Sequence, residues 1–260
     1  MAEYKTIHYN IEQRIATIAI KRPDMGNSID YLTAKEIRDA LEYSEKLSDI
    51  RVIVLKGDKK FFCSGTDLNY IRKLREFGIE ENKYDTEFSS DLLIDIQKNS
   101  KLVIALVEGY ALGYGWALAQ SCDLVIASEK AIFGIPELKK GFLPVMAFSI
   151  LINHIGQAKL KQLIYSTENI TAEEAKELNL IHKIFPSENF GNLAYEEIQK
   201  IIDRIAGGGI GIIKKLFVDA NKMPMEPALK FTARMLAHAR NTQEYAIGID
   251  SFFKNEILKW

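Results

Sequence analysis

The sequence predicts an α/β protein, with a parallel sheet and crossover helices followed by a helical C-terminal region. Three short and almost wholly apolar runs have the composition of strands that are buried on both faces. These runs are residues 51–57, 102–109 and 123–128. Segments with helical character separate the runs, and this alternation of strand and helix favours a parallel sheet. From about residue 148, helical patterns follow one another instead.

The elements of the α/β part follow in chain order. Residues 4–20 alternate apolar and polar side chains around a polar break, which predicts a β-hairpin. Helical spacing then covers residues 33–47. Residues 59–68 are predicted to be a loop, and the charged segment 69–85 a mobile helix-loop excursion. The apolar positions of residues 88–96 indicate another helix.

The C-terminal part is predicted to be helical. Thr171 followed by Glu174 has the spacing of a capping box at a helix start. Further helices are predicted at residues 190–205, 210–221, 225–240 and 242–257. The last of them carries more apolar surface than one exposed terminal helix can leave in water. We therefore divide the chain into an α/β core at residues 1–190 and a helical region at residues 191–260 that serves self-association.

Charge and hydropathy exclude several classes of function. The formal net charge is −1, so no overall field attracts nucleic acid or an anionic membrane. No apolar run approaches the roughly 18 residues that a membrane-spanning helix needs, and residues 1–10 are too polar for a signal peptide. Cys63 and Cys122 lie in apolar surroundings without metal-ligand spacing, which indicates buried free thiols. These features predict a cytoplasmic protein with no metal site.

A glycine-rich turn at residues 109–116, GYALGYGW, follows one apolar run and leads into a helical pattern. Such a turn exposes backbone N–H groups at a helix N-terminus, where an anion or a developing oxyanion can bind. Leu118 stands where a dinucleotide fingerprint needs its third glycine, and the Gly-Lys-Ser/Thr ending of a phosphate loop is absent. The alternative is that these glycines only permit close packing. A similar turn at residues 61–68, FFCSGTDL, follows the preceding strand, and together the two turns could present two N–H donors to one oxygen.

Five blocks of the sequence stand in a characteristic order. They are KRPDMGNSI, FFCSGTDL, VEGYALGYGWALAQSCDLVIASEKAIFGIPELKKGFLP, TAEEAKELNLIHKIFP and TQEYAIGIDSFF. Together they resemble the crotonase, or enoyl-CoA hydratase/isomerase, superfamily from about residue 4 to residue 255. The resemblance is more specific for the fold than for the reaction.

The resemblance implies a crotonase-like spiral of ββα units, with the helical C-terminal region forming homotrimers or dimers of trimers. It also implies an acyl-CoA substrate, or an acyl carrier protein thioester, and no cofactor beyond the coenzyme A of the substrate. Enzymes of this superfamily hold a thioester enolate between two backbone N–H groups, which by position are those of Thr66 and Tyr114. Preorganised donors at an oxygen that gains charge stabilise the transition state strongly.

The match departs from the hydratases of the superfamily at three positions. Those enzymes use two glutamates; the second is present as Glu137, but Ala117 stands in place of the first. Tyr114 replaces a glycine and is expected to bring a phenol close to the acyl group, and Val145 replaces another glycine, which predicts a drier pocket.

These departures bear on the reaction. A single buried carboxylate suits a proton shuttle between C2 and C4 of a 3-enoyl thioester, so we favour a Δ3-Δ2-enoyl-CoA isomerase with Glu137 as its base. The alternatives are an enoyl-CoA hydratase, another crotonase reaction (lyase, decarboxylase or thioester hydrolase), and a protein that has lost catalysis and only binds acyl thioesters.

The remaining candidates concern substrate binding. The residues considered for the CoA phosphates and adenine are Lys21, Arg22, the backbone at Ser64, Gly65 and Asp67, and Lys254 of the same or a neighbouring subunit. The residues expected by position to line the substrate site are Leu68, Gly113, Trp116, Ala117, Pro136 and Val145. Asp67 also has the position of a helix N-cap. Trp116 either lines the acyl tunnel or anchors its helix in the core.

Overall fold

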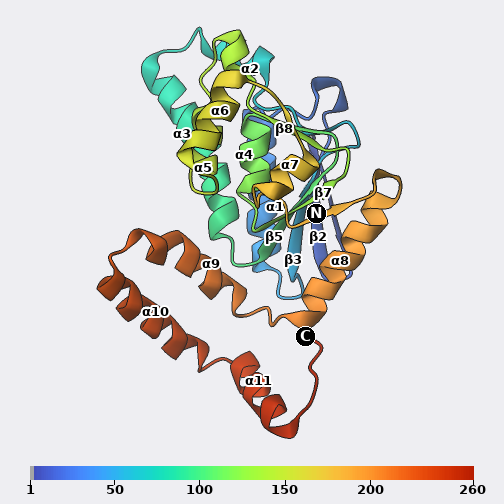
Figure 1. Ribbon diagram of the computed structural model, residues 1–260, viewed down its shortest axis with the longest axis vertical. Coiled ribbons are helices and arrows are strands. Elements are labelled where there is room, and N and C mark those ends of the chain that lie inside the picture. The colour runs from blue at the N-terminus through green and yellow to red at the C-terminus, as the bar shows by residue number, and fades with distance from the viewer. Residues whose placement is uncertain (1–2) are drawn as a thin grey trace.

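A six-stranded sheet runs through the centre of the computed structural model, which describes residues 3–260 (Figure 1). In spatial order, its strands are β1 (Ile7–Glu12), β2 (Ile15–Ile20), β3 (Val52–Lys56), β5 (Leu102–Val107), β7 (Leu124–Ser128) and β10 (Lys183–Phe185). β1 and β2 form the predicted antiparallel hairpin, and all later neighbours pair in parallel. The predicted parallel sheet is therefore confirmed. Met1 and Ala2, the start of the expected core, lie outside the described residues.

A second, smaller sheet explains how the chain spirals. Its strands are β4 (Phe61–Cys63), β6 (Tyr110–Leu112), β8 (Ile132–Gly134) and β9 (Ile170–Thr171). Each of the first three follows a strand of the large sheet and precedes a helical segment, so a ββα unit repeats along the chain. This is the spiral that the resemblance implies. The sequence pattern predicts only a loop at residues 59–68, because strands of three residues are too short to show a period of two.

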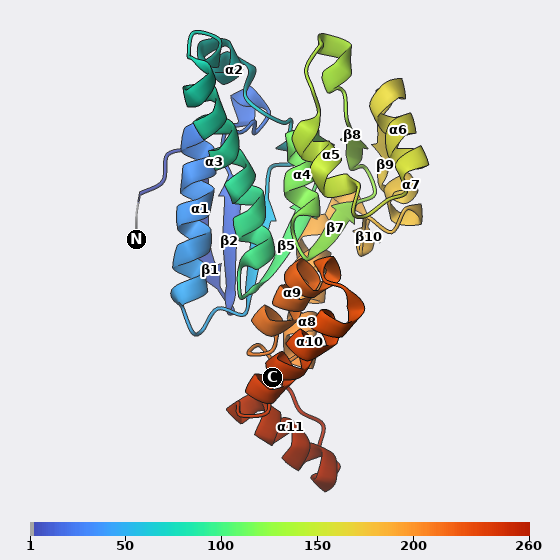
Figure 2. The same ribbon diagram turned by 90° about the vertical axis from the view of Figure 1, so that its left-hand side faces the viewer.

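Helices cover both faces of the large sheet. They are α1 (Tyr31–Lys46), α3 (Ile79–Lys98) and α4 (Tyr114–Gln120) on one face and α8 (Phe190–Arg204) on the other. Figure 2 shows α1 and α3 side by side along the sheet. The side chains of β3 alternate accordingly: Ile53 and Leu55 belong to the larger apolar core, whereas Val52 and Val54 pack with α8.

Short helices occupy the turns between these elements. They are η1 (Pro23–Met25), α2 (Leu68–Leu74), η2 (Glu137–Lys140), α5 (Val145–Leu151), α6 (Gln157–Ser166), α7 (Ala172–Glu177) and η3 (Ser187–Asn189). Thr171 and Glu174 form the predicted capping box of α7. The charged segment 69–85 is more regular than its pattern indicates, since α3 runs unbroken for 20 residues. The buried residues of α3 lie in its second half, and its charged first half stays helical without burying a stripe.

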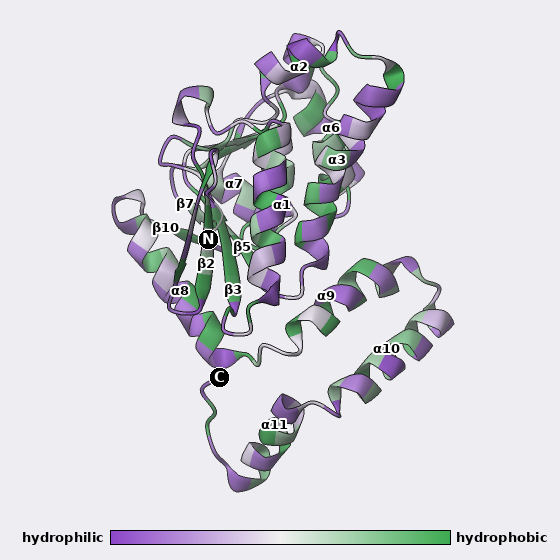
Figure 3. Cartoon of the chain, turned by 180° about the vertical axis from the view of Figure 1, so that it is seen from behind, coloured by the Kyte–Doolittle hydropathy of each residue, from purple (hydrophilic) through white to green (hydrophobic). Residues whose placement is uncertain are grey.

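The last helices form an arm that stands away from the sheet (Figures 1 and 3). They are α9 (Ile210–Asp219), η4 (Ala220–Lys222), α10 (Met225–Ala239) and α11 (Gln243–Lys254). α8 lies beyond residue 190 but packs on the sheet. The arm is anchored by Lys214, whose buried ammonium group pairs with Asp123 at 2.7 Å and donates to the carbonyl oxygens of Ile96 and Lys101. Figure 3 shows hydrophobic segments along all three long helices of the arm.

Both cysteines are buried, as the sequence predicts. Cys63 and Cys122 are buried free thiols, and burial raises the pKa of the Cys63 thiol to about 12, so it stays protonated. No helix within residues 3–260 is both long enough and apolar enough to span a bilayer. The same residues contain no group of three His, Cys, Asp or Glu side chains that could hold a metal ion.

Candidate active site

Two strand-to-helix turns meet beside the small sheet. The first joins β4 to α2 and contains Gly65, whose N–H faces the Cys63 sulfur at 3.4 Å. The second joins β6 to α4 through Gly113. A Cβ atom built on Gly65 would lie 3.2 Å from the Leu112 carbonyl oxygen and 3.8 Å from the Tyr114 nitrogen. The two turns are therefore in contact, as expected for turns that follow neighbouring parallel strands.

The first turn leaves one N–H group free. The Ser64 N–H donates to the Gly26 oxygen at 3.0 Å, and the Asp67 N–H donates to the Ile29 oxygen at 2.8 Å. Thr66 lies opposite Ile29 in an isolated parallel bridge, and its N–H has no acceptor within residues 3–260. The N–H groups of Ser64 and Asp67 are thus not available to a substrate, and contacts from the other backbone groups of this turn stay a prediction. The Thr66 N–H remains available.

The second turn leaves the N–H of Tyr114 free. Gly113 has φ +52°, a left-handed conformation that favours glycine, and its N–H donates to the Gly134 oxygen at 2.9 Å. The Gly113 oxygen accepts from the Ala117 N–H at 3.1 Å, which starts α4. As the first residue of α4, Tyr114 has an N–H without an acceptor in the described part of the chain. Helix N-termini carry partial positive charge, so this donor suits an oxyanion.

The Glu137 carboxylate lies directly against the second turn. A Cβ atom on Gly113 would stand 2.1 Å from its Oε1 atom, so any other residue there would displace the carboxylate. The Oε2 atom is buried and has no hydrogen-bond partner among the described residues. Desolvation by burial raises the pKa of Glu137 above its ordinary value. Ala117 is fully buried in α4 and adds no second carboxylate. Among the carboxylates at the paired turns, that of Asp67 is the N-cap of α2, whereas Glu137 has a buried oxygen without a partner among the described residues.

The phenol of Tyr114 is not a free group beside the acyl position, which corrects the expectation from the sequence. It donates a 2.6 Å hydrogen bond to the carbonyl oxygen of Ser89 in α3, and the residue is only 6% exposed. Burial raises the pKa of this phenol, so it remains a donor. The side chain ties the second turn to α3. Sequence reasoning missed Ser89 because a backbone carbonyl acceptor has no residue signature.

Removing this tether should have a modest, measurable effect. Tyr114→Phe should lower the free energy of unfolding by about 1 kcal/mol, because the ring still packs while the phenolic hydrogen bond is lost. We also expect kcat to fall more than KM changes, because the turn is less firmly held. Urea unfolding and steady-state kinetics measure both effects.

The matched control for this variant is Tyr110→Phe, in β6 just before the turn. The Tyr110 phenol makes no hydrogen bond to another described residue and is partly exposed, so this change should alter neither quantity. Equal results for the two variants would show that the tether has no role.

Other predicted lining residues divide between core and surface. Trp116 is fully buried and lies 5.6 Å from the ring of Phe133, so it anchors α4 in the core rather than lining an acyl tunnel. Leu68 and Val145 begin α2 and α5 and are 60% and 50% exposed. Pro136 is half-buried and precedes Glu137 at the N-cap of η2. The exposed side chain of Leu68 follows the Thr66 turn and is accessible to an acyl chain.

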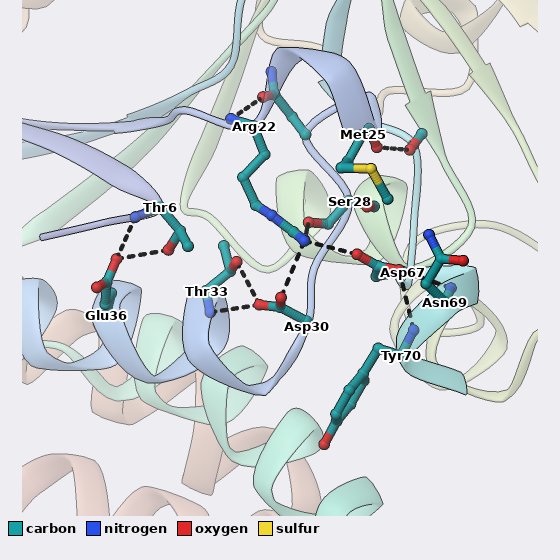
Figure 4. A network of polar contacts seen from close by, with 12 residues as sticks. Thr6, Arg22, Met25, Ser28, Asp30, Thr33, Glu36, Asp67, Asn69 and Tyr70 are labelled. Atoms are coloured by element: carbon teal, nitrogen blue, oxygen red, sulfur yellow. Dashed lines mark hydrogen bonds and ion pairs between the residues drawn. The ribbon is translucent and has the colours of Figure 1, made fainter. Parts of the chain in front are cut away.

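Arg22 is an internal cation rather than a phosphate ligand (Figure 4). Its guanidinium group pairs with Asp67 at 2.7 Å and with Asp30 at 3.0 Å, and it donates to the Ser28 oxygen. Asp67 also accepts from two N–H groups in the first turn of α2, which confirms it as an N-cap. Burial alone would raise the pKa of Asp67, but the hydrogen bonds from Arg22 and the backbone hold it below its usual value. The prediction that the Arg22 side chain binds CoA phosphates is therefore wrong.

The two candidate lysines lie apart. Lys21 is exposed next to Arg22. Lys254 is the last residue of α11, which is well separated from α4 in both Figure 1 and Figure 2. Lys254 is therefore not part of the site around Thr66 in its own chain, and a contact from Lys254 of a neighbouring subunit stays a prediction.

Known proteins resemble the chain along almost its whole length. The sequence model of the family described as enoyl-CoA hydratase/isomerase matches residues 10–260. A 2,3-dehydroadipyl-CoA hydratase of Escherichia coli (strain K12) is 33% identical over 178 residues, which are 68% of either chain. A short-chain-enoyl-CoA hydratase of Clostridium acetobutylicum is 28% identical over 255 residues, 95% of this chain and 94% of that one.

A solved structure supports the same assignment. An enoyl-CoA hydratase/isomerase from Marinobacter aquaeolei matches with a TM-score of 0.89 at 26% sequence identity, over 98% of both chains. The ββα spiral agrees with this match. The chain belongs to the enoyl-CoA hydratase/isomerase family, the crotonase superfamily, whose members act on acyl-CoA substrates.

Proposed function

We propose that this protein is a Δ3-Δ2-enoyl-CoA isomerase in which Glu137 moves the proton. One observation carries the proposal: the Glu137 carboxylate, whose Oε2 atom is buried without a hydrogen-bond partner among the described residues, lies against the second of the paired turns. By the family resemblance, hydratases hold a second glutamate at the position of Ala117, where it helps to bind and activate water. A fully buried methyl group cannot do this.

The proposed reaction needs only groups of this chain. Glu137 takes a proton from C2 of a 3-enoyl thioester, and the electron pair of that C–H bond moves into the thioester to give an enolate. The N–H groups of Thr66 and Tyr114 stabilise the negative oxygen. The carboxyl group then returns the proton to C4, and the double bond ends between C2 and C3. No water is added, and the composition of the substrate does not change.

The pH dependence follows from the raised pKa of Glu137. The carboxyl group must be ionised to accept the C2 proton, so activity is lost as the pH falls through its pKa. Since burial raises that pKa, the acid limb of kcat/KM should lie above 4.5, the ordinary value for glutamate. A pH–rate profile with a 3-enoyl-CoA measures the limb. An acid limb at or below the ordinary value would contradict a buried base.

Hydration is the second candidate, and the names of the relatives favour it. Both curated relatives described above are named as hydratases. The two reactions are separated by assaying one preparation with 3-enoyl-CoA and with 2-trans-enoyl-CoA and identifying the products by chromatography. The isomerase proposal predicts 2-trans-enoyl-CoA from the first substrate and no 3-hydroxyacyl-CoA from the second. Rapid formation of 3-hydroxyacyl-CoA would favour hydration.

We also propose that residues 191–260 join copies of the chain into a homotrimer or a dimer of trimers. The support is the arm, whose exposed apolar side chains include Phe217, Phe252 and Phe253, at 76%, 76% and 79% exposure. Such a surface is unfavourable in water. Sedimentation equilibrium should give three or six copies, and Phe252→Asp with Phe253→Asp should shift the protein toward smaller species. A monomer at micromolar concentration would refute the proposal.

A further inference from the structure

A cavity of about 430 Å³ lies between α2 and α3, outside the Glu137 site. Four aromatic side chains line it: Tyr31, Tyr70, Phe77 and Tyr84. Phe77 and Tyr84 are 52% and 64% exposed, so the cavity is reached from solvent. A cavity of this volume can hold a small organic group.

The charged side chains that line the cavity determine which kind of ligand it can bind. Glu80, Glu81 and Asp85 line the cavity, and no lysine or arginine does. Asp85 accepts a hydrogen bond from the Tyr70 hydroxyl, whereas the carboxylates of Glu80 and Glu81 form no ion pair or hydrogen bond with another described residue. Anions, including the CoA phosphates, are therefore repelled, and a purely apolar tail would have to desolvate carboxylates.

A cation is favoured by both components of the lining. The faces of tyrosine and phenylalanine rings attract an ammonium group through their quadrupole, and this attraction is strongest for weakly hydrated organic cations. The carboxylates of Glu80, Glu81 and Asp85 attract the same cation by their negative charge. We propose that this cavity binds an organic ammonium group.

The cavity shares structure with the candidate active site. α2 begins directly after Asp67, two residues beyond Thr66, and the ring of Tyr31 stacks on Phe88 of α3 at 4.5 Å. Phe88 is next to Ser89, whose carbonyl holds Tyr114. Because the cavity is this near to the active site, the ammonium group could be the end of the acyl chain of a substrate. It could also belong to a separate small molecule that binds between α2 and α3.

Calorimetric titration of the full chain tests the binding site at low ionic strength. Choline is the probe, and 3,3-dimethylbutan-1-ol is its neutral isostere. Saturable binding of choline, at least about tenfold tighter than that of the isostere, is expected. Absent or equal binding of the two compounds would overturn the proposal.

Single substitutions in the lining test whether choline binds in this cavity, and conservative variants separate loss of binding from loss of folding. Tyr84→Leu and Glu80→Gln should each weaken choline binding several-fold, whereas Tyr84→Phe keeps the ring face and should retain it. The control is Glu76→Gln, because Glu76 is exposed just outside the cavity. If Tyr84→Leu and Glu80→Gln both bound choline as tightly as the wild-type protein, the cation would bind elsewhere, and the proposal would be refuted.

The source of the cation is decided with substrates, and this step alone rests on the proposed function. Acyl-CoA thioesters that end in a trimethylammonium group are compared with those that end in a tert-butyl group. A higher kcat/KM for the cationic series that disappears in Glu80→Gln assigns the cavity to the acyl tail. Equal values, with choline still bound, assign it to a free cation. Failure of the isomerase proposal would leave the choline titration unaffected.

Discussion

Replacing Glu137 with glutamine is expected to lower kcat for isomerisation of a 3-enoyl-CoA at least about a hundredfold, the usual loss when a general base is removed. Glutamine has the shape of glutamate but cannot take a proton from C2. No second carboxylate stands at position 117 to replace it. Steady-state kinetics with purified protein measures the change.

The same variant should not unfold the protein. The Oε2 atom of Glu137 is buried without a partner, so the charged form costs stability through desolvation. Thermal unfolding at neutral pH should therefore give an equal or higher Tm. The control is Glu168→Gln, which changes an exposed carboxylate and should leave kcat and Tm unchanged. An unchanged kcat in Glu137→Gln would remove this residue from the mechanism.

The second large effect is expected from Gly113→Ala. The new methyl group would start 2.1 Å from the Glu137 Oε1 atom, and the backbone at φ +52° disfavours any residue with a Cβ atom. The carboxylate must move, and the free N–H of Tyr114 turns with the displaced backbone. Because the base and the oxyanion donor are disturbed together, kcat should fall at least about a hundredfold.

Gly141→Ala separates backbone strain from the collision. Gly141 has φ +74°, and a Cβ atom there would meet nothing within 4 Å. This variant should lose about 1 kcal/mol of stability and keep most of its activity. If both alanine variants lowered kcat equally, the contact between Gly113 and Glu137 could not be the cause.

The large sheet was predictable because its strands carry the signal. Residues 52–56 alternate between two buried faces, so nearly every side chain there is apolar. The small sheet was not predictable from the pattern, because its strands have two or three residues each. The position of the arm relative to the sheet depends on single contacts such as that of Lys214 with Asp123, which are 91 residues apart.

The candidate site was predictable where a residue type or a turn carries the chemistry. Glu137 and the two glycine turns have such signals. The role of Arg22 was not predictable. Its ion-pair partner Asp67 is 45 residues away in the sequence, and no local pattern links the two. The partner of Tyr114 is a backbone oxygen, which any residue could supply. Those contacts required the folded chain.

The central claim is that Glu137 works without an activated water, and product analysis in H2¹⁸O tests it most directly. Wild-type protein is incubated with a 3-enoyl-CoA, and the thioesters are examined by mass spectrometry. We expect 2-trans-enoyl-CoA without ¹⁸O as the product, formed at least about a hundredfold more slowly by Glu137→Gln. Unchanged 3-enoyl-CoA, together with ¹⁸O-labelled 3-hydroxyacyl-CoA formed from 2-trans-enoyl-CoA in a parallel incubation, would contradict the isomerase proposal and identify a hydratase.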